Sequence, residues 1–369
     1  MTDTHGQRRQ PPPPRPPHAA WHSALADLSP ANFGMVMATG IISIAANMLG
    51  LRLVAELLFG LNVGVYVLLC ILNLARLAWY PRRCLSDLTD HLRGPGFFTL
   101  VAATSVLGAQ FLVLREAFAI GLTLWCAATV AWVILTYAIF AALTVKEHKP
   151  PLEQGINGAW LLAIVATQSI TVLSALIAAR IAQPYRLEVN FFALSMWLWG
   201  GMLYIWMMSL IFYRYTFFVL QPGDLSPPYW INMGAMAIST LAGSLLAINA
   251  DDAPFLLSLR PFIKGFTIFY WATGTWWIPM LLLLGIWRHF YKRFPLRYDP
   301  LYWGAVFPFG MYAACTHELL RAMDFHFLEP MPRLLLYAAL AGWLVVFTGV
   351  VRRAGGILLA SWRGASPVR

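Results

Sequence analysis

The residues best placed for a specific role lie between Trp303 and Glu318, in an apolar stretch of membrane length. This stretch contains Phe307-Pro308-Phe309-Gly310. A proline inside a helix removes one backbone hydrogen bond, so a purely lipid-facing helix has little reason to contain one. Pro308 and Gly310 therefore predict a kink, and the ring of Phe307 directly before it is placed to plug a central cavity. A phenylalanine that merely packs in a kinked helix is the alternative, and residue chemistry alone leaves it open.

A group of ionisable residues follows at the end of the same stretch. It consists of His317, Glu318 and Arg321. If the stretch crosses a membrane, these side chains lie near its outer end and are candidates for a pH-responsive vestibule. A solvated surface cluster is the alternative interpretation.

The sequence contains no pattern that predicts catalysis, a metal site or a cofactor. The four cysteines, at positions 70, 84, 126 and 315, lack the spacing of a metal or redox motif. Asp251-Asp252 would have to begin an acidic metal-binding cluster in a membrane enzyme, but no second acidic motif accompanies it, and we interpret it as part of a loop. We therefore expect no enzyme, no catalytic residue, no metal and no cofactor.

The distribution of charge predicts the elements that position these residues. Charged residues make up 11% of the 369 residues, far below the roughly 25% of soluble domains. Every Asp, Glu, Lys and Arg lies outside ten windows, each holding at least the roughly 17 to 20 residues that a helix needs to cross a bilayer. The windows are 28–51, 57–75, 94–114, 117–145, 154–179, 189–213, 225–250, 265–287, 300–317 and 334–351. The sequence thus predicts an all-α integral membrane protein with ten transmembrane helices, without the alternating polarity of a membrane barrel.

The net charge of +10 follows from membrane topology and requires no nucleic-acid partner. With the N-terminus in the cytoplasm, most of the 26 Lys and Arg fall on the cytoplasmic side, as the positive-inside rule demands. We expect a multi-pass protein of the cell (inner) membrane with both termini cytoplasmic. Residues 1–27 predict a disordered Pro/Arg-rich tail, 28–353 the transmembrane channel or transporter domain, and 354–369 a short basic tail.

Short connections at 50–56 and 115–116 predict helical hairpins, and the repeated pattern predicts five of them. The odd-numbered spans carry more small and polar residues, whereas the even-numbered spans are richer in bulky side chains. We expect the odd spans to form an inner ring and the even spans to face lipid. Small residues also let membrane helices pack closely, so close packing remains the alternative to lining a pore. The candidate pore-lining residues are Thr39, Ser43, Thr104, Gln168, Asn232 and Ser239.

Four short segments, in the same order along the chain, resemble the tellurite-resistance/dicarboxylate transporter family. This family includes the bacterial TehA proteins, yeast malate and sulfite carriers, and plant guard-cell slow anion channels. The segments are Asn32-Phe33-Gly34-Met35-Val36-Met37-Ala38-Thr39-Gly40, Asn157-Gly158-Ala159-Trp160-Leu161-Leu162, Tyr229-Trp230-Ile231-Asn232-Met233-Gly234 and Phe307-Pro308. The resemblance implies five hairpins in quasi-fivefold arrangement around a central pore, commonly in a homotrimer. It also implies that a phenylalanine directly before a proline on the ninth helix occludes the pore, and Phe307 matches that position.

The expected function is membrane passage of small inorganic or organic anions through a largely neutral pore with a phenylalanine gate. No Lys or Arg falls inside the windows, so the pore offers only weak sites, which suit conduction. The nearest alternative is a proton-coupled carrier or exporter of C4-dicarboxylate, sulfite or tellurite-type oxyanions. No window holds an Asp or Glu for a proton relay, which leaves His317 at a span's edge as the candidate group.

Overall fold

The computed structural model describes residues 17–295 and 299–363. Within these residues the chain forms helices and no strand, which confirms the predicted all-α class. Nine helices in the described ranges are long and apolar enough to cross a membrane, as expected of a multi-pass membrane protein. The helix at the predicted ninth span, α12 (Trp303–Met323), has the length but is not among the nine. Thr316, His317 and Glu318 near its end lower its hydropathy.

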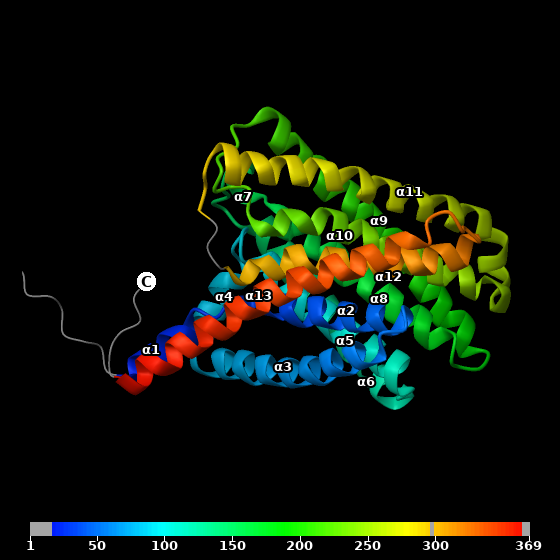
Figure 1. The fold of residues 1–369 in the computed structure, drawn as a ribbon, viewed down its shortest axis with the longest axis horizontal. Helices are drawn as coiled ribbons and strands as arrows, with labels where there is room; N and C mark the ends of the chain where they lie inside the picture. The colour runs from blue at the N-terminus through cyan, green and yellow to red at the C-terminus, as the bar shows by residue number, and fades with distance from the viewer. Residues whose placement is uncertain (1–16, 296–298, 364–369) are drawn as a thin grey trace, which may run out of the picture.

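The long helices follow one another as hairpin pairs whose two members pack together. The pairs are α2 (Gly34–Met48) with α3 (Arg52–Trp79), α5 (Phe98–Arg115) with α6 (Phe118–Val145), α8 (Leu162–Ala178) with α9 (Tyr185–Phe217), α10 (Ile231–Ile248) with α11 (Pro254–Ile286), and α12 with α13 (Pro330–Arg363). Shorter elements are α1 (Pro17–Ala26), α4 (Pro81–Leu88), α7 (Leu152–Gly155), η5 (Asn249–Asp252) and the π-helical turn η6 (Trp287–Tyr291). Figure 1 shows the long helices running side by side along the bundle.

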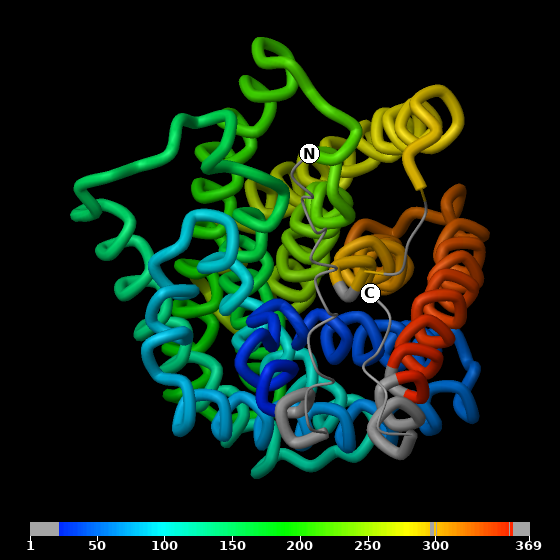
Figure 2. The backbone as a smooth tube through the Cα atoms, turned by 90° about the vertical axis from the view of Figure 1, so that its left-hand side faces the viewer, coloured from blue at the N-terminus to red at the C-terminus, as the bar shows by residue number. Residues whose placement is uncertain are grey.

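The first helix of each pair lies inside the bundle. α2, α5, α8, α10 and α12 contact one another in that cyclic order, and α12 contacts α2 again, so the contacts form a closed ring, which we call the inner ring. Burial agrees with this arrangement, because 89% of the apolar window of α8 is buried but only 11% of that of its neighbour α6. Figure 2 looks along the helices and shows α11 (yellow) and α13 (red) at the periphery, with α12 (orange) inside them.

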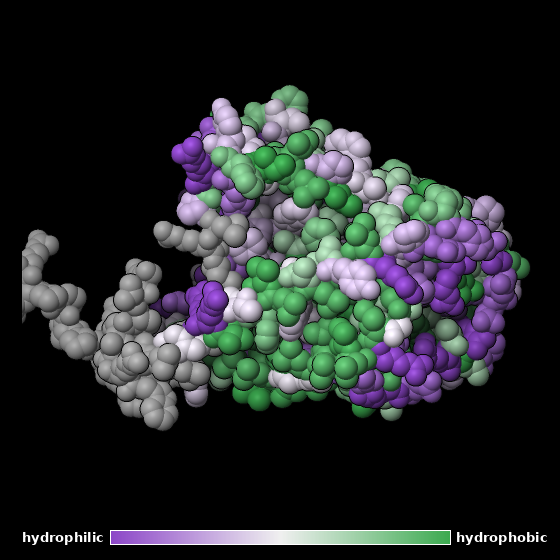
Figure 3. Space-filling view, viewed as in Figure 1, coloured by the Kyte–Doolittle hydropathy of each residue, from purple (hydrophilic) through white to green (hydrophobic). Residues whose placement is uncertain are grey.

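The peripheral helices present apolar side chains outward. Leu74 on α3 and Val345 on α13 are examples, each at least two-thirds exposed. Figure 3 shows an apolar surface over the middle of the bundle and polar residues gathered at the end opposite α1. Such a belt is the surface that a lipid bilayer would cover.

A short 3-10 turn precedes every helix of the inner ring. The turns are η1 (Pro30–Phe33), η2 (Gly94–Phe97), η3 (Gly158–Leu161), η4 (Pro227–Trp230) and η7 (Pro300–Tyr302). Proline suits the first turn of a helix because the missing N–H would lack an intrahelical acceptor there. Ser29, Asn157 and Asp299 cap three of the turns, each accepting a hydrogen bond from the backbone N–H two residues later. The five turns contact one another in the same cyclic order as the helices, so five helix N-termini meet at one end of the inner ring.

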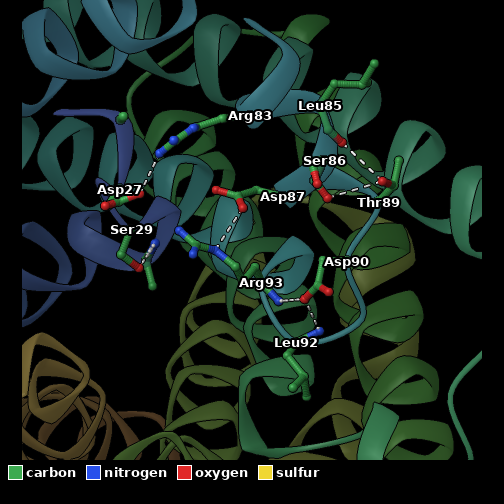
Figure 4. A network of polar contacts seen from close by, with 12 residues as sticks. Asp27, Ser29, Arg83, Leu85, Ser86, Asp87, Thr89, Asp90, Leu92 and Arg93 are labelled. Carbon is green, nitrogen blue, oxygen red and sulfur yellow. Dashed lines mark hydrogen bonds and ion pairs between the residues drawn. The ribbon is translucent and has the colours of Figure 1, made fainter. Parts of the chain in front are cut away.

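An ion-pair network fastens the short helices α1 and α4 at this end (Figure 4). Asp87 on α4 accepts from the buried Arg76 Nη2 of α3 at 2.5 Å and from Arg93 Nε at 2.9 Å. Arg76 Nε also donates to a carbonyl at the end of α1, and Arg83 donates to Asp27 at 2.8 Å. The buried charge of Arg76 is paired with a carboxylate and hydrogen-bonded to a carbonyl, which offsets its loss of hydration. This network therefore joins α1, α3 and α4 at this end of the bundle.

The structure differs from the expected tails. Residues 17–26, expected to be disordered, form α1, and its end is held by the network of Arg76 and Arg83. At the other end α13 continues as one helix to Arg363, ten residues beyond the expected end of the transmembrane domain at Arg353. Residues 1–16 and 364–369 of the two expected tails lie outside the described residues.

Candidate pore and gate

Two cavities lie inside the inner ring, and residues of all five helices or their N-terminal turns line each of them. The large cavity has a volume of about 430 Å³ and is lined by the C-terminal halves of the helices. The small cavity has a volume of about 30 Å³ and lies among the N-terminal turns and the first helical turns.

Phe307 lies between the two cavities along α12. Its side chain is 1% exposed and lines the small cavity together with Met37 and Thr99, whereas Met311, one turn further along α12, lines the large cavity. The ring points toward α10, where a Cβ added at Gly234 would lie 3.2 Å from Phe307 Cδ1. Phe307 thus packs against a glycine of the neighbouring helix that leaves room for its ring.

The proline and glycine beside Phe307 have separate effects. α12 runs as one helix through Pro308, so the expected kink does not interrupt it. Pro308 cannot donate to the carbonyl of Gly304, and Gly304 lines the small cavity. At Gly310 a Cβ would lie 2.7 Å from Ile42 Cγ1, so the glycine allows α12 to approach α2 closely. Phe309 points elsewhere, because its ring packs on Trp230 at a centroid distance of 5.6 Å.

None of the six candidate pore-lining residues borders either cavity. Five of the six bond to a peripheral helix, which belongs to the same hairpin for Ser43 and Gln168 and to a neighbouring hairpin for Thr39, Thr104 and Asn232. The contacts are Trp343 Nε1 to Thr39 Oγ1 (2.9 Å), Ser43 Oγ to the Ala55 carbonyl (2.7 Å), Thr104 Oγ1 with Tyr66 Oη (2.9 Å), Gln168 Nε2 to the Trp197 carbonyl (3.0 Å) and Tyr204 Oη to Asn232 Oδ1 (2.9 Å). Ser239 Oγ donates within its own helix to Ala235 at 2.7 Å. A polar group in a membrane helix needs a partner, and here the outer layer of helices supplies most of them.

Five residues, one on each inner helix, are the first in chain order to border the large cavity. They are Ile41, Ser105, Ser169, Ile238 and Met311, which we call the serine layer. Sequence reasoning missed both serines, although each directly follows a residue that was chosen, Thr104 or Gln168. One residue along a helix turns the side chain by about 100°, so the neighbouring position faces the cavity instead of the next helix.

The predicted vestibule residues are brought together. His317, Glu318 and Arg321 all line the large cavity, together with Arg180. Glu318 is 3% exposed and accepts from Arg321 Nη1 at 2.9 Å, while the Arg321 side chain is 60% exposed. The charged groups of this cavity therefore lie toward the C-terminal ends of the inner helices, away from Phe307. His326, beyond α12, does not line it; a hydrogen bond to Glu329 and the nearby Asp324 raise the pKa of His326.

The other ionisable groups considered from sequence have structural partners. Asp251 pairs with Arg260 and Asp252 with Arg186. In the described part of the chain, no three His, Cys, Asp or Glu residues lie close enough together to hold a metal ion. The four cysteines are free thiols.

Comparison with known proteins places the chain in a family. The sequence profile of the voltage-dependent anion channel family matches residues 27–351, which include the inner ring and both cavities. An uncharacterized membrane protein of Mycobacterium tuberculosis is 34% identical over 45% of this chain and 84% of its own length. An uncharacterized transporter of Methanocaldococcus jannaschii is 23% identical over 87% of this chain and 93% of its own, and a sulfite efflux pump of Arthroderma otae is 24% identical over 90% and 92%. With a match over nearly the whole helical bundle, the chain belongs to the voltage-dependent anion channel family.

Proposed function

We propose that this protein passes small anions across a membrane along the axis of the inner ring. In this proposal ten spans form five hairpins in quasi-fivefold arrangement, α12 being the span that is least apolar. The observation that carries it is the position of Phe307 between two cavities bordered by the same five helices. The family, and the likeness to a sulfite efflux pump, support an anion as the transported species.

The electrostatics of the inner ring favour an anion without trapping it. The N-terminus of a helix carries a partial positive charge, and five N-termini meet around the small cavity. No Lys or Arg is among the residues that line the small cavity in the described part of the chain. Helix ends attract an anion but hold it weakly, and weak sites permit conduction. Passive flux of several small monovalent anions is the behaviour we expect.

The gate is the part of the proposal that a single substitution tests. Shortening Phe307 to Ala removes the ring between the two cavities, and a wetted path should replace it. We expect purified Phe307→Ala in liposomes to show higher passive anion flux than the wild type at an imposed voltage. The variant should fold. Truncating a ring beside cavities should lower the free energy of unfolding by less than the roughly 3 to 5 kcal/mol that truncating a packed core phenylalanine costs.

Phe309→Ala is the matched control. Its ring packs on Trp230 and lines neither cavity, so its truncation should leave the flux unchanged. The gate is refuted if Phe307→Ala folds like the wild type and conducts no more than Phe309→Ala.

A proton-coupled carrier or exporter is the second candidate, and the buried carboxylate of Glu318 favours it. This group sits on the wall of a cavity large enough for an oxyanion or a C4-dicarboxylate, where protonation would change the local charge. Flux that requires a pH gradient, and that loses this requirement in Glu318→Gln, would identify the carrier. Flux that follows voltage alone in both proteins would identify the channel.

The proposal also covers the membrane location, the orientation and the oligomeric state of the protein. We place the protein in the inner membrane with both termini in the cytoplasm, in accord with the excess of basic residues expected on that side. We further propose a homotrimer with one pore in each chain, as the resemblance to the transporter family implies.

A further inference from the structure

The wall of the large cavity consists mostly of apolar side chains, which a pathway for small anions does not require. Among them are Ile44, Val106, Val172 and Leu241, each from a different inner helix. A cavity of about 430 Å³ with such a wall has the size and composition of sites that bind small organic molecules. A hydrocarbon chain that enters it leaves water for apolar surroundings, which is favourable.

The charged groups of this cavity give its mouth a positive charge. Arg180 and Arg321 line the cavity and are exposed, whereas Glu318 is buried. Arg321 Nη1 donates to both carboxylate oxygens of Glu318, at 3.0 and 2.9 Å, and Arg180 Nη1 donates to the Leu176 carbonyl at 2.8 Å. With His317 neutral, two guanidinium groups and one carboxylate leave one positive charge. A guanidinium has five N–H donors, so both arginines can still bind a carboxylate.

The spacing between the apolar and the charged parts of the wall sets the shape of a ligand that uses both. On α12, Met311 is the first and Arg321 the last residue to line the cavity, and ten positions separate them, which is about 15 Å along the helix. Such a ligand has one anionic head and an apolar chain of similar length. A second charge on the ligand would have to lie among apolar side chains, which is unfavourable, so a dicarboxylate fits less well.

We propose that the large cavity binds a medium-chain alkyl carboxylate such as decanoate, with its carboxylate at Arg180 and Arg321 and its chain directed toward Met311. The bound chain fills the space inside the inner ring and excludes water and ions from it. The ligand is therefore a blocker and not a transported species. Its binding is independent of the proposed transport function, and only the block rests on that function.

Photolabelling of the wild-type protein in lipid nanodiscs tests the site without transport. The probe is a decanoate analogue with a diazirine near the end of its chain, and mass spectrometry locates the labelled residues. We expect label on cavity-lining residues of α10 and α12, and loss of this label with excess decanoate. Decanol, which lacks the charge, and succinate, which has two charges and a short chain, should compete at least about tenfold more weakly. Equal competition by either compound, or label confined to the outward faces of the peripheral helices, would overturn the site.

A matched pair of variants tests the role of the arginines. In the described chain Arg180 pairs with no carboxylate, so Arg180→Gln removes one guanidinium without leaving a buried charge unpaired. Arg333→Gln is the control, because Arg333 is exposed near the start of α13, at the same end of the bundle, and lines neither cavity. We expect Arg180→Gln to weaken competition by decanoate about tenfold, the effect of losing one hydrogen bond to a charged group. Decanoate that competes equally in the two variants would contradict the placement of its carboxylate.

Flux measurements separate the block from the gate. Decanoate is added to Phe307→Ala liposomes at a concentration that saturates the labelled site and leaves protein-free liposomes tight. We expect the chloride flux to fall, and to fall less when Arg180→Gln is combined with Phe307→Ala. If Phe307→Ala does not conduct, the gate fails and photolabelling alone decides the site. If it conducts and saturating decanoate leaves the flux unchanged, the block is wrong.

Discussion

At the scale of single residues, the position of the Phe307 ring depends on what lies opposite it. Gly234 on α10 supplies that space, since an added Cβ would meet Phe307 Cδ1 at 3.2 Å and Pro308 Cγ at 3.0 Å. Such contacts are tighter than ordinary packing, so the ring and α12 would have to shift. The small cavity beside the ring gives it a direction in which to move.

We therefore predict that Gly234→Ala displaces the gate. Its anion flux in liposomes should exceed that of the wild type but stay below that of Phe307→Ala, with a stability loss of roughly 1 to 3 kcal/mol. In the Phe307→Ala background the same change should add little flux, because the ring it acts on is gone. A Gly234→Ala protein with wild-type flux and stability would show that the ring and the glycine are not in contact.

At the scale of elements, the polar residues of the inner helices join them to the outer layer. Thr39 Oγ1 accepts from Trp343 Nε1 of α13 at 2.9 Å, and Trp343 is itself buried. Removing the acceptor leaves an indole N–H without a partner in an apolar environment. The contact is therefore structural in our interpretation, whereas a pore-lining Thr39 would affect flux first.

We predict that Thr39→Val lowers the stability of the purified protein by about 1 kcal/mol, the usual size of a hydrogen bond between membrane helices. Thermal unfolding in detergent measures it, and the ratio of anion fluxes should stay the same. Trp343→Phe combined with Thr39→Val should unfold closer to the wild type than Thr39→Val alone, because no donor is left unsatisfied. A change in anion selectivity without a change in unfolding temperature would place Thr39 in the pore instead.

The same helices show what could be predicted from the sequence. The charge-free windows located the long helices well, because a charged side chain in the bilayer is too unfavourable to occur there often. The rotation of each helix was not predictable, since small and polar residues serve both a pore and a helix interface. Thr104 and Ser105 are adjacent in the sequence and both are polar. Thr104 nevertheless bonds to Tyr66, whereas Ser105 lines the large cavity. Only the tertiary packing decides between them.

At the scale of the whole molecule, the two ends of the bundle differ in chemistry. One end gathers α1, α4 and the five 3-10 turns, with Arg76, Arg83 and Arg93 in its ion-pair network. The other end holds the mouth of the large cavity with Glu318 and the exposed Arg321. Basic residues near helix ends mark the cytoplasmic side in most membrane proteins, so the end with the turns should face the cytoplasm.

Labelling of single cysteines tests this orientation. Asp252, in the short turn between α10 and α11, is exposed at the end expected to face outward, and Arg293, just after η6, is exposed at the opposite end. In a background where Cys84 and Cys126 are replaced by Ser, Asp252→Cys should react with an impermeant maleimide in intact spheroplasts. Arg293→Cys should react only after the membrane is opened. The reverse labelling pattern would mean that the protein has the opposite orientation in the membrane. Anions entering from outside would then meet the five helix N-termini and Phe307 before the serine layer.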